Sequence, residues 1–376
     1  MNDVRDRAQT IAQVFNASAP AAIRSEIEEE YVAVAEEQRA RGRPDRRILL
    51  IGGAGYVGSV IAGELLDCGY SVRCLDLLLY RNDVCALQLL RSPNYEFVFG
   101  DHCSPRSVHG ALEGITDVVI LSGLVGDPIT KKYPDQSFAI NQRGMENLIA
   151  GLKGRGLNRV VFVSTCSNYG LVPETVLAGE DYELRPLSLY AKAKVVIETL
   201  LLGTRGQVDF TPTVLRFATA FGLSPRMRFD LTVNQFTREM YLRQPLAVYD
   251  ADTWRPYCHT KDFAGAVRRV LEIGRARVAF EVFNVGRDDN NCTKRTIVDK
   301  IGKHLPDAPV EFKQHGSDPR NYRVDFAKLN RQLCFVPQYT VDDGIAEVLG
   351  ALRNRLFDRV DDNLAFYGNY EIHYDG

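Results

Sequence analysis

The segment Arg47-Ile-Leu-Leu-Ile-Gly-Gly-Ala-Gly-Tyr-Val-Gly58 joins an apolar run of strand length to a helix through a cluster of glycines. Ile48 to Ile51 are continuously hydrophobic, as a parallel strand buried on both faces requires, and the apolar residues after Tyr56 have helical spacing. Glycines at such a joint let the backbone approach a pyrophosphate, while the positive N-terminus of the helix faces the anion. The segment predicts a dinucleotide-binding turn, with an ordinary glycine-rich turn as the alternative.

The glycines of this turn fit two frames. One is Gly53-x-Gly55-x-x-Gly58, and the other is Gly52-x-x-Gly55-x-x-Gly58. In both frames Gly53 or Gly55 allows the close approach to phosphate, and Gly58 lets the helix lie close against the strand.

Asp76 supports the dinucleotide interpretation. Ser71 to Leu75 predict a second strand, and Asp76 stands at its end, where a carboxylate can accept both ribose hydroxyls of an adenosine. A carboxylate there also repels a 2′-phosphate, and no arginine lies in the glycine turn. We therefore expect NAD in preference to NADP, with Asp76 as a helix cap or loop charge as the alternative.

Length and composition are those of an ordinary globular protein. The chain has 376 residues, 45% of them hydrophobic and 25% charged, which suggests two domains or one large domain. The net charge is −2 and no basic segment interleaves with aromatic residues, so neither nucleic acid nor an anionic membrane is an expected partner. There is no apolar run of membrane-spanning length and no signal-peptide pattern, so a cytoplasmic location is expected.

Cysteine spacing predicts reduced thiols. No Cys-x-x-Cys pair occurs, and several cysteines lie inside apolar segments, so we expect neither a disulfide framework nor a metal site. The eight cysteines are at positions 68, 74, 85, 103, 166, 258, 292 and 334.

From Arg47 onward, strand and helix patterns alternate, which predicts an α/β fold of the Rossmann type, a doubly wound parallel sheet. The expected strands are 48–51, 71–75, 95–99, 117–122, 159–164 and 211–216. Ligands of such sheets bind beyond the carboxyl ends of the strands. The segments to inspect are therefore Asp101, 121–127, 164–170 and 217–223.

Domain boundaries follow from where this alternation begins and loosens. Residues 1–45 predict a charged helical extension, either a surface or oligomer-contact helix or a lid over the site. Residues 46–218 are expected to form the dinucleotide-binding domain, with 255–285 returning to it. Residues 219–376 are expected to form mainly a smaller substrate-binding domain.

Tyr190 and Lys194 are four residues apart, on one face of a predicted helix. A phenol titrates near pH 10 in water, so it works as a base at neutral pH only where cationic charge favours the phenolate, and Lys194 can supply that charge. The spacing of Tyr190 and Lys194 is by itself weak evidence for a catalytic pair. Upstream, a buried strand ends in hydroxyl residues, and Thr165 or Ser164 can hydrogen-bond a reacting substrate oxygen, with a Ser/Thr-rich turn as the alternative.

Together these motifs resemble the extended short-chain dehydrogenase/reductase family, specifically its sugar-nucleotide epimerases and dehydratases, over residues 47–355. The matching motifs, in chain order, are Gly52-x-x-Gly55-x-x-Gly58, Asp76, Gly100-Asp101, Ser164-Thr165 through Tyr169-Gly170, Tyr190-x-x-x-Lys194, Leu215-Arg216-Phe217 running to Gly222, and Arg255 ahead of His259 and Asp262.

The resemblance implies a role for each matched position. It makes Tyr190 the acid/base, places Thr165 beside the substrate hydroxyl, and places Lys194 on the nicotinamide ribose. The implied NAD-binding residues are Gly52, Gly55, Tyr56, Val57, Gly58, Asp76, Asp101 at the adenine, Leu121, Ser122 and Lys194. The implied substrate-binding residues are Cys166, Ser167, Asn168, Asn234, and Arg255 and Arg320 near the diphosphate.

The family resemblance also implies a homodimer, with a four-helix interface from helices near 141–153 and 190–202. The apolar positions that suggest it are Met145, Leu148, Ile149, Val196 and Leu200.

Departures from the family pattern narrow the reaction. The 4,6-dehydratases carry Asp-Glu after the catalytic threonine, because elimination needs an acid and a base there. This chain has Cys166-Ser167, which argues against dehydration. A packed thiol is the alternative to a chemical role for Cys166. The segment 121–128 is also unusual, and Thr219 replaces a familiar asparagine.

We therefore expect an NAD-dependent epimerase of a nucleotide-diphosphate sugar, acting through a transient keto sugar with hydride returned to the opposite face. The alternatives are an NAD(P)-dependent dehydratase or keto-reductase of the same family, and a non-catalytic NAD-binding scaffold. For Arg255 and Arg320, the alternative to diphosphate binding is pairing with a nearby acid such as Asp252 or Asp325.

Overall fold

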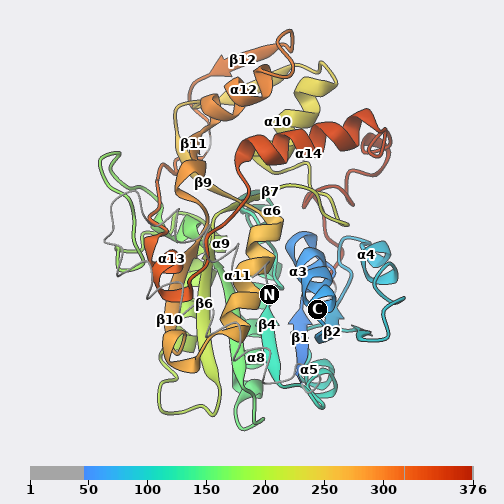
Figure 1. Ribbon diagram of the computed structural model, residues 1–376, viewed down its shortest axis with the longest axis vertical. Helices are drawn as coiled ribbons and strands as arrows, with labels where there is room; N and C mark the ends of the chain where they lie inside the picture. The colour runs from blue at the N-terminus through green and yellow to red at the C-terminus, as the bar shows by residue number, and fades with distance from the viewer. Residues whose placement is uncertain (1–45, 317, 375–376) are drawn as a thin grey trace, which may run out of the picture.

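A computed structural model describes residues 46–316 and 318–374. The helical extension expected at 1–45 lies outside the described residues. The main sheet confirms the expected strands to within two residues and adds an edge strand, β10, that the pattern did not single out (Figure 1). Its strands are β1 (Arg47–Ile51), β2 (Ser71–Asp76), β3 (Tyr95–Phe99), β4 (Asp117–Ile120), β5 (Arg159–Thr165), β6 (Thr211–Phe217) and β10 (Glu281–Val285).

The seven strands are all parallel and follow the order β10-β6-β5-β4-β1-β2-β3. β1 lies inside the sheet, pairing with β2 on one side and β4 on the other. Chain order reverses between β1 and β4, and a sheet of this kind opens a crevice for ligands at that point. The predicted doubly wound parallel sheet is confirmed.

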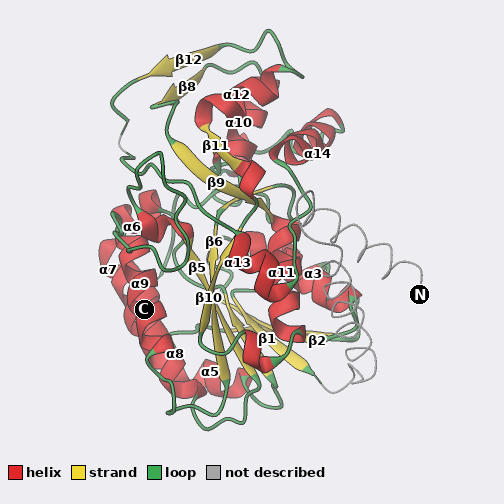
Figure 2. Cartoon of the chain, turned by 60° about the vertical axis from the view of Figure 1, so that its left-hand side comes forward, coloured by secondary structure: helices red, strands yellow, loops and turns green. Residues whose placement is uncertain are grey.

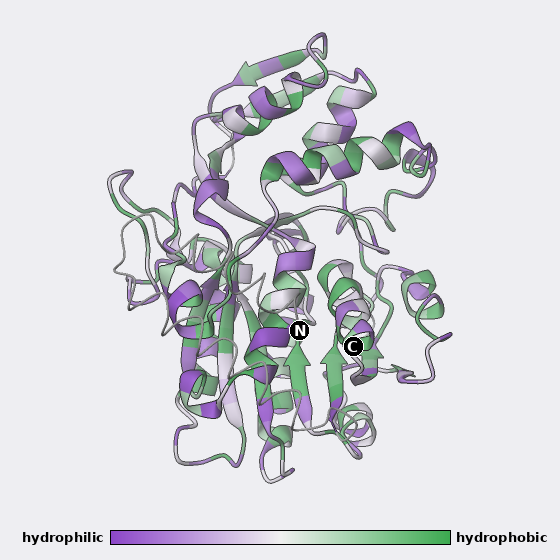
Figure 3. Ribbon diagram, viewed as in Figure 1, coloured by the Kyte–Doolittle hydropathy of each residue, from purple (hydrophilic) through white to green (hydrophobic). Residues whose placement is uncertain are grey.

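Helices cover both faces of the sheet because successive side chains of each strand point to opposite faces (Figure 2). In β1, Ile48 and Leu50 join the core on one face, and Leu49 and Ile51 join the core on the other. The first face carries α3 (Tyr56–Asp67), α11 (Thr260–Glu272) and α13 (Ala327–Leu333). The second carries α5 (Pro105–Ala111), α8 (Met145–Leu152) and α9 (Leu189–Leu202). Figure 3 shows β1 and β2 as mainly hydrophobic ribbons between these layers.

The remaining short helices flank the sheet. They are α4 (Asp83–Leu87), α6 (Asp127–Lys132) and α7 (Pro134–Phe138). α6 begins a few residues after β4, so the β4–α6 loop lies at the carboxyl edge of the sheet.

The second part of the chain has its own apolar core, around Phe221, Phe236 and Ile345, and forms the upper part of Figure 1. It contains a three-stranded sheet in the order β11-β9-β7 and a two-stranded sheet of β12 and β8. These strands are β7 (Thr219–Phe221), β8 (Leu246–Tyr249), β9 (Trp254–His259), β11 (Asn291–Thr293) and β12 (Val310–Lys313). Its helices are α10 (Thr232–Tyr241), α12 (Lys294–Gly302) and α14 (Val341–Arg353).

The chain passes between the two parts more than once. α11 and β10 return to the main sheet after β9, in the region where the sequence analysis placed a return at 255–285. The division at 218/219 stays a prediction.

All eight cysteines are free thiols, which confirms the expectation of no disulfide framework. Of the helices in the described part of the chain, none is both long and apolar enough to cross a membrane.

Candidate active site

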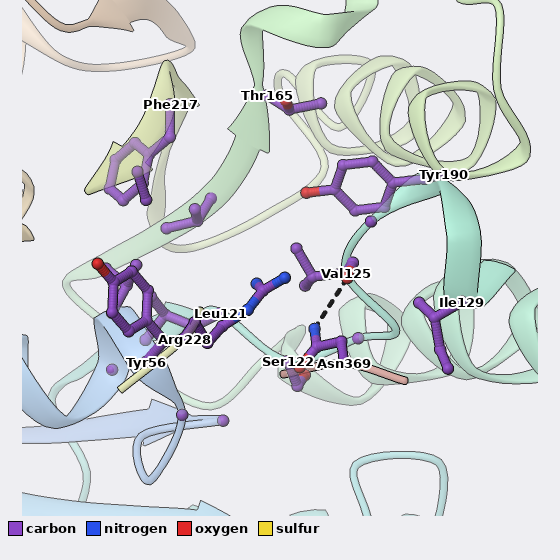
Figure 4. A pocket seen from close by; sticks show the side chains of 18 of the residues that line it. Tyr56, Leu121, Ser122, Val125, Ile129, Thr165, Tyr190, Phe217, Arg228 and Asn369 are labelled. Atoms are coloured by element: carbon purple, nitrogen blue, oxygen red, sulfur yellow. Dashed lines mark hydrogen bonds between the residues drawn. The ribbon is translucent and has the colours of Figure 1, made fainter. Parts of the chain in front are cut away.

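A cavity of about 500 Å³ lies beyond the carboxyl ends of the central strands, between the sheet and the second part of the chain (Figure 4). Its lining includes every residue predicted to bind the cofactor and all three predicted catalytic residues. These are Gly52, Gly55, Tyr56, Val57, Gly58, Asp76, Asp101, Leu121, Ser122, Thr165, Tyr190 and Lys194. Ser167, Arg255 and Arg320 also line it. Residues distant in sequence therefore converge as the motifs predicted.

The glycine turn follows the Gly52-x-x-Gly55-x-x-Gly58 frame, since these three glycines line the cavity while Gly53 packs against β2. Gly52 has φ +88°, and a Cβ there would lie 2.7 Å from the backbone of Ser122. A Cβ on Gly58 would overlap the carbonyl oxygen of Gly52. Only glycine fits these positions, and Gly55 as N-cap leaves the first amides of α3 facing the cavity.

Asp76 stands at the end of β2 and is held by backbone amides. Ala54 N donates to Asp76 Oδ2 at 3.0 Å, and Leu78 N donates to Oδ1 at 2.8 Å. Burial raises the pKa of Asp76, although the two amides and the charge of Arg226 act to lower it. A carboxylate has further lone pairs, so Asp76 can still accept ribose hydroxyls.

The predicted acid/base and its cation lie on α9, near the end of β5. Lys194 Nζ donates to the carbonyl oxygen of Val163 at 2.8 Å and lies 5.9 Å from the centre of the Tyr190 ring. Figure 4 shows the Tyr190 hydroxyl pointing into the cavity. The backbone of β5 thus fixes Lys194 beneath the phenol.

Of the two candidate hydroxyls, the structure favours Thr165. The Ser164 hydroxyl donates to the buried carboxylate of Glu198. Thr165 Oγ1 accepts from Ser167 N at 3.1 Å, which leaves its hydroxyl hydrogen available to a substrate.

The two titrating groups shift in opposite directions. Burial lowers the pKa of Lys194 to about 8, while the charge of Glu198 acts to raise it. Burial raises the pKa of Tyr190, and the charge of Asp127 raises it further, against the lowering effect of Arg228 and Arg320. The protein alone, Lys194 included, therefore does not make Tyr190 a base at neutral pH. This differs from the simplest form of the sequence argument, in which the charge of Lys194 was enough.

Arg255 and Arg320 share a carboxylate at the far wall of the cavity. Arg255 Nη2 lies 2.9 Å from Asp318 Oδ2, and Arg320 bonds Asp318 through Nε and Nη2, each at 2.8 Å. Arg320 also donates to Ser167 Oγ at 3.0 Å and lies 2.9 Å from Asp127 Oδ2. Two guanidinium groups in one cavity wall form a site suited to a diphosphate.

Burial alone would raise the pKa of Asp318, but the bonds and charges of the two arginines hold it well below its usual range. The alternative of pairing with a nearby acid is confirmed for both arginines, but the acid is Asp318 and not the suggested Asp252 or Asp325. Asp252 pairs with Arg295 at 2.7 Å, and Asp325 accepts from Ala327 N.

The structure corrects two predicted substrate contacts on the turn after β5. Cys166 Sγ donates to the carbonyl oxygen of Arg216 at 3.1 Å, and Asn168 Nδ2 donates to Glu198 at 2.7 Å. Both side chains are fully buried behind the strand, beside the Glu198–Arg216 ion pair, and neither lines the cavity. Cys166 is therefore a packed thiol, the alternative left open by the sequence.

Asn234 is also corrected. It is fully buried in α10 and does not line the cavity. Its Oδ1 accepts from Gly222 N at 3.1 Å, and its Nδ2 donates to Tyr56 Oη and to the Arg228 carbonyl, each at 2.9 Å. Asn234 therefore supports two cavity residues from behind.

Sequence reasoning assigned no role to several lining residues. Asp127 lies in the 121–127 segment selected for inspection, and its Oδ1 is buried without a hydrogen-bond partner among the described residues. Arg226 and Arg228 come from the segment before α10, and Figure 4 shows the Arg228 side chain reaching into the cavity. The clustering of arginine and aromatic residues at 224–229 was the available signal, without a direction for each side chain.

The end of the chain was missed entirely. Asn369, Tyr370 and Tyr374 line the cavity and belong to residues 366–374, which we call the C-terminal strap. No motif marks this segment, because its role depends on where the chain returns after α14.

Known proteins resemble this chain in sequence and in fold. A family model described as the NAD dependent epimerase/dehydratase family matches residues 48–286. The chain is 27% identical over 328 residues to a dTDP-glucose 4,6-dehydratase of Streptomyces niveus, covering 81% of this chain and 91% of that protein. It is also 27% identical over 329 residues to a UDP-glucose 4-epimerase of Corynebacterium glutamicum, covering 83% and 97%.

Among solved structures, the UDP-glucose 4-epimerase of Thermus thermophilus, in complex with NAD, matches with a TM-score of 0.71 at 24% identity. The match covers 82% of this chain and 99% of that one. Since an epimerase and a dehydratase are equally identical to this chain, its reaction has to be argued from the site.

Proposed function

Because this chain belongs to the NAD-dependent epimerase/dehydratase family, we propose that it is an epimerase of a nucleotide-diphosphate sugar, acting with NAD as its cofactor. One observation carries this proposal. Thr165, Tyr190 and Lys194 line the cavity together, whereas the two positions after Thr165 hold a buried thiol and a hydroxyl bonded to Arg320. The three side chains needed to oxidise a sugar hydroxyl are all present. The acid pair that a dehydratase carries directly after the catalytic threonine is missing.

The cradle fits NAD. Gly52 and Gly58 allow a turn so tight that a Cβ at either position would clash with backbone, the α3 amides face the cavity, and Asp76 keeps acceptor capacity at the ribose position. When bound, NAD supplies a reversible two-electron acceptor for a sugar carbon. Lys194 is placed to bond the nicotinamide ribose.

Tyr190 Oη removes the proton of the sugar hydroxyl as the carbon is oxidised, and it returns that proton once the keto sugar has turned over. Because the pKa of Tyr190 is raised, its phenol loses its own proton and becomes the phenolate base only while cationic charge is close. Lys194 contributes such charge at neutral pH, since it is protonated below about pH 8, and a bound, oxidised NAD would add the positive charge of its nicotinamide ring. Thr165 donates to the reacting sugar oxygen and orients it.

Arg255 and Arg320 hold the substrate diphosphate. In the structure both guanidinium groups already pair with the carboxylate of Asp318. A diphosphate therefore binds beside that carboxylate or displaces it. Bidentate guanidinium–phosphate bonds favour that exchange.

Dehydration is the second candidate, and Asp127 is the observation that favours it. Its carboxylate lines the cavity, its Oδ1 lacks a hydrogen-bond partner among the described residues, and its charge acts on Tyr190. An acid at this place is able to serve an elimination, although it comes from a different segment than the family's Asp-Glu pair.

A mass-spectrometric screen with a panel of nucleotide sugars tests the proposal. We expect an isomer of one substrate to form without net growth of NADH absorbance. Tyr190→Phe should lower turnover by about 10²- to 10⁴-fold, the usual contribution of general acid–base catalysis. The matched control Tyr133→Phe, on a tyrosine outside the cavity lining, should leave turnover unchanged. Near-wild-type turnover in Tyr190→Phe, or a released 4-keto-6-deoxy product, would contradict an epimerase.

We further propose a homodimer, as the family resemblance suggests, with α9 at its interface. Val196 and Leu200 are each 39% exposed on α9, but Met145, Leu148 and Ile149 are buried against the sheet and offer no surface. The interface therefore has to be carried by α9 in place of the expected α8 positions. Light scattering at micromolar concentration should give twice the chain mass, and Leu200→Glu should halve it. The free thiols fit a reducing compartment such as the cytoplasm.

A further inference from the structure

The C-terminal strap is anchored to both sides of the cavity. At its start, Phe229 N donates to the Tyr367 carbonyl at 2.8 Å. Asn369 Nδ2 then donates to the carbonyl oxygen of Val125 at 2.8 Å, the dashed line in Figure 4. Arg226 Nη2 donates to Asn369 Oδ1, also at 2.8 Å. A single buried asparagine thus bridges the loop after β4 and the arginine of the opposite wall.

The far end of the strap is held by packing and by one charged hydrogen bond. Ile372 is buried in an apolar cluster that includes Leu124 and Ile129. Tyr374 Oη donates to Asp101 Oδ2 at 2.8 Å. The strap therefore docks on the loops that follow β3 and β4, at the same edge of the sheet as the glycine turn.

The strap covers a defined part of the cavity. Asn369, Tyr370 and Tyr374 line it together with Asp76 and Asp101, the residues at the ribose and adenine positions. At this adenosine end the strap contacts the loop after β4 through Asn369 and the loop after β3 through Tyr374. A bound adenosine would lie between the strap and the carboxyl edge of the sheet.

We infer that the strap is the outer wall of the adenosine subsite, and that it must detach for NAD to enter or leave. The contact with Asp101 does not block the subsite. Asp101 Oδ1 accepts from Cys103 N and Oδ2 accepts from Tyr374, but a carboxylate offers about four lone-pair sites. Lone pairs therefore remain for an adenine amino group.

Detaching the strap costs free energy because it breaks contacts with the rest of the protein. It breaks the Asn369 and Tyr374 hydrogen bonds and exposes the Ile372 side chain to water. Cofactor exchange is therefore slow, while sugar exchange at the arginine end does not require it. This division suits the proposed epimerase, on which the functional interpretation of the strap rests, because its cofactor is restored in every turnover.

The release rate of NADH, measured without any sugar, tests whether the strap holds the cofactor in the adenosine subsite. Protein loaded with NADH is mixed with a large excess of NAD, and the loss of bound NADH fluorescence is followed. Ile372→Asp should speed release by about 10-fold or more, and Tyr374→Phe by several-fold, the scale expected for one hydrogen bond to a charged group. The control His373→Asp adds the same charge at the neighbouring exposed position and should leave the rate unchanged.

Three outcomes would overturn the inference. Equal release rates in all variants would mean that the strap does not hold the cofactor. Faster association with unchanged release in Ile372→Asp would mean that the strap competes with NAD. Equal acceleration in His373→Asp would mean that charge alone loosens the segment. Tyr374→Phe keeps the test valid if Ile372→Asp fails to fold, and the absence of sugar separates this result from the proposed reaction.

Discussion

The two walls of the cavity hold their charged groups in different ways. On the sheet wall the partners are backbone groups: Asp76 accepts from the amides of Ala54 and Leu78, and Lys194 donates to the carbonyl of Val163. Strand and turn geometry fixes these partners, so the sheet wall is preformed. A ligand arriving there adds its contacts to those already made.

On the opposite wall the partners are side chains of opposite charge. Arg228 makes two bonds with Asp230, at 2.8 and 2.6 Å, and Arg255 and Arg320 share Asp318. Arg228, Arg255 and Arg320 are each paired with a carboxylate before any ligand arrives. An anionic ligand on this wall must therefore compete with a carboxylate.

Because their partners differ, the two walls should respond to different kinds of substitution. Binding on the sheet wall should be lost when its backbone geometry is disturbed, and should tolerate distant charge changes. Binding on the opposite wall should depend on the number and shape of the charges present.

Gly58→Ala should have the largest effect and should act on the sheet wall alone. Its Cβ would meet the backbone of Gly52 and Gly53, where nothing flexible can give way. Such overpacking costs about 1 to 3 kcal/mol or more of folding free energy unless the turn shifts. A shifted turn no longer presents its amides to the pyrophosphate, so NAD affinity should fall by roughly 100-fold.

Gly63→Ala is the matched control, because it lies in the same helix with no atom within 4 Å of an added Cβ. It should leave NAD affinity unchanged and raise the free energy of unfolding by roughly 0.5 to 1 kcal/mol. Calorimetric titration and thermal unfolding measure both quantities. Equal NAD affinity in the two variants would refute a preformed cradle.

Arg255→Lys should have the next largest effect, on the opposite wall. Lysine keeps the charge but loses the planar fork, so nucleotide-sugar binding should weaken by about 1 to 3 kcal/mol while NAD affinity stays nearly constant. Arg295→Lys, at a surface pair with Asp252, is the control. Titrating both ligands checks this: equal losses for NAD and sugar would indicate a folding defect, and no loss for sugar would place the diphosphate elsewhere.

A pH profile should show the sheet-wall lysine directly. Burial lowers the pKa of Lys194 to about 8, so the side chain is charged below that pH and neutral above it. Because the charge assists proton removal by Tyr190, kcat/KM should fall as pH rises through about 8. The residual activity of Lys194→Met should lack this limb, and an unchanged limb in that variant would assign it to another group.

Asp127→Asn should give the smallest effect and sharpen the link between the walls. The Asp127 charge raises the pKa of Tyr190, so its removal should lower that pKa and increase the phenolate fraction at a fixed pH, by less than about 10-fold. Ultraviolet titration of the phenolate, with Tyr190→Phe as background, measures it. A pKa that stays constant or rises would show that Asp127 acts mainly through Arg320.

The contrast between the walls also explains how far the sequence could predict them. The glycine turn, Asp76, Asp101 and Thr165 each lie at the end of a strand of the sheet or just after it, so strand assignment was enough to place them. Tyr190 and Lys194 needed only helical spacing. These positions depend on local structure, which hydrophobic pattern and glycines specify.

Such local patterns could not predict the direction of a side chain, or which distant segments of the chain meet at the cavity. Cys166 and Asn168 lie on the correct turn but point behind β5, and Asn234 points away from the cavity. Asp318 as the arginine partner and the strap at Tyr374 depend on segments that meet only in the folded chain. Tertiary packing decides these contacts, and no local signal in a single sequence encodes it.

Product mass after turnover in deuterium oxide distinguishes epimerisation by hydride return from carbon-acid chemistry and from dehydration. If Tyr190 moves a proton only between oxygen atoms while NAD oxidises and restores the sugar carbon, the product should be an isomer with no carbon-bound deuterium. Its mass, after back-exchange of hydroxyl groups, should equal that of the substrate. An isomer one mass unit heavier would indicate carbon-acid chemistry, and loss of water with deuterium uptake would indicate dehydration; either result would contradict the account.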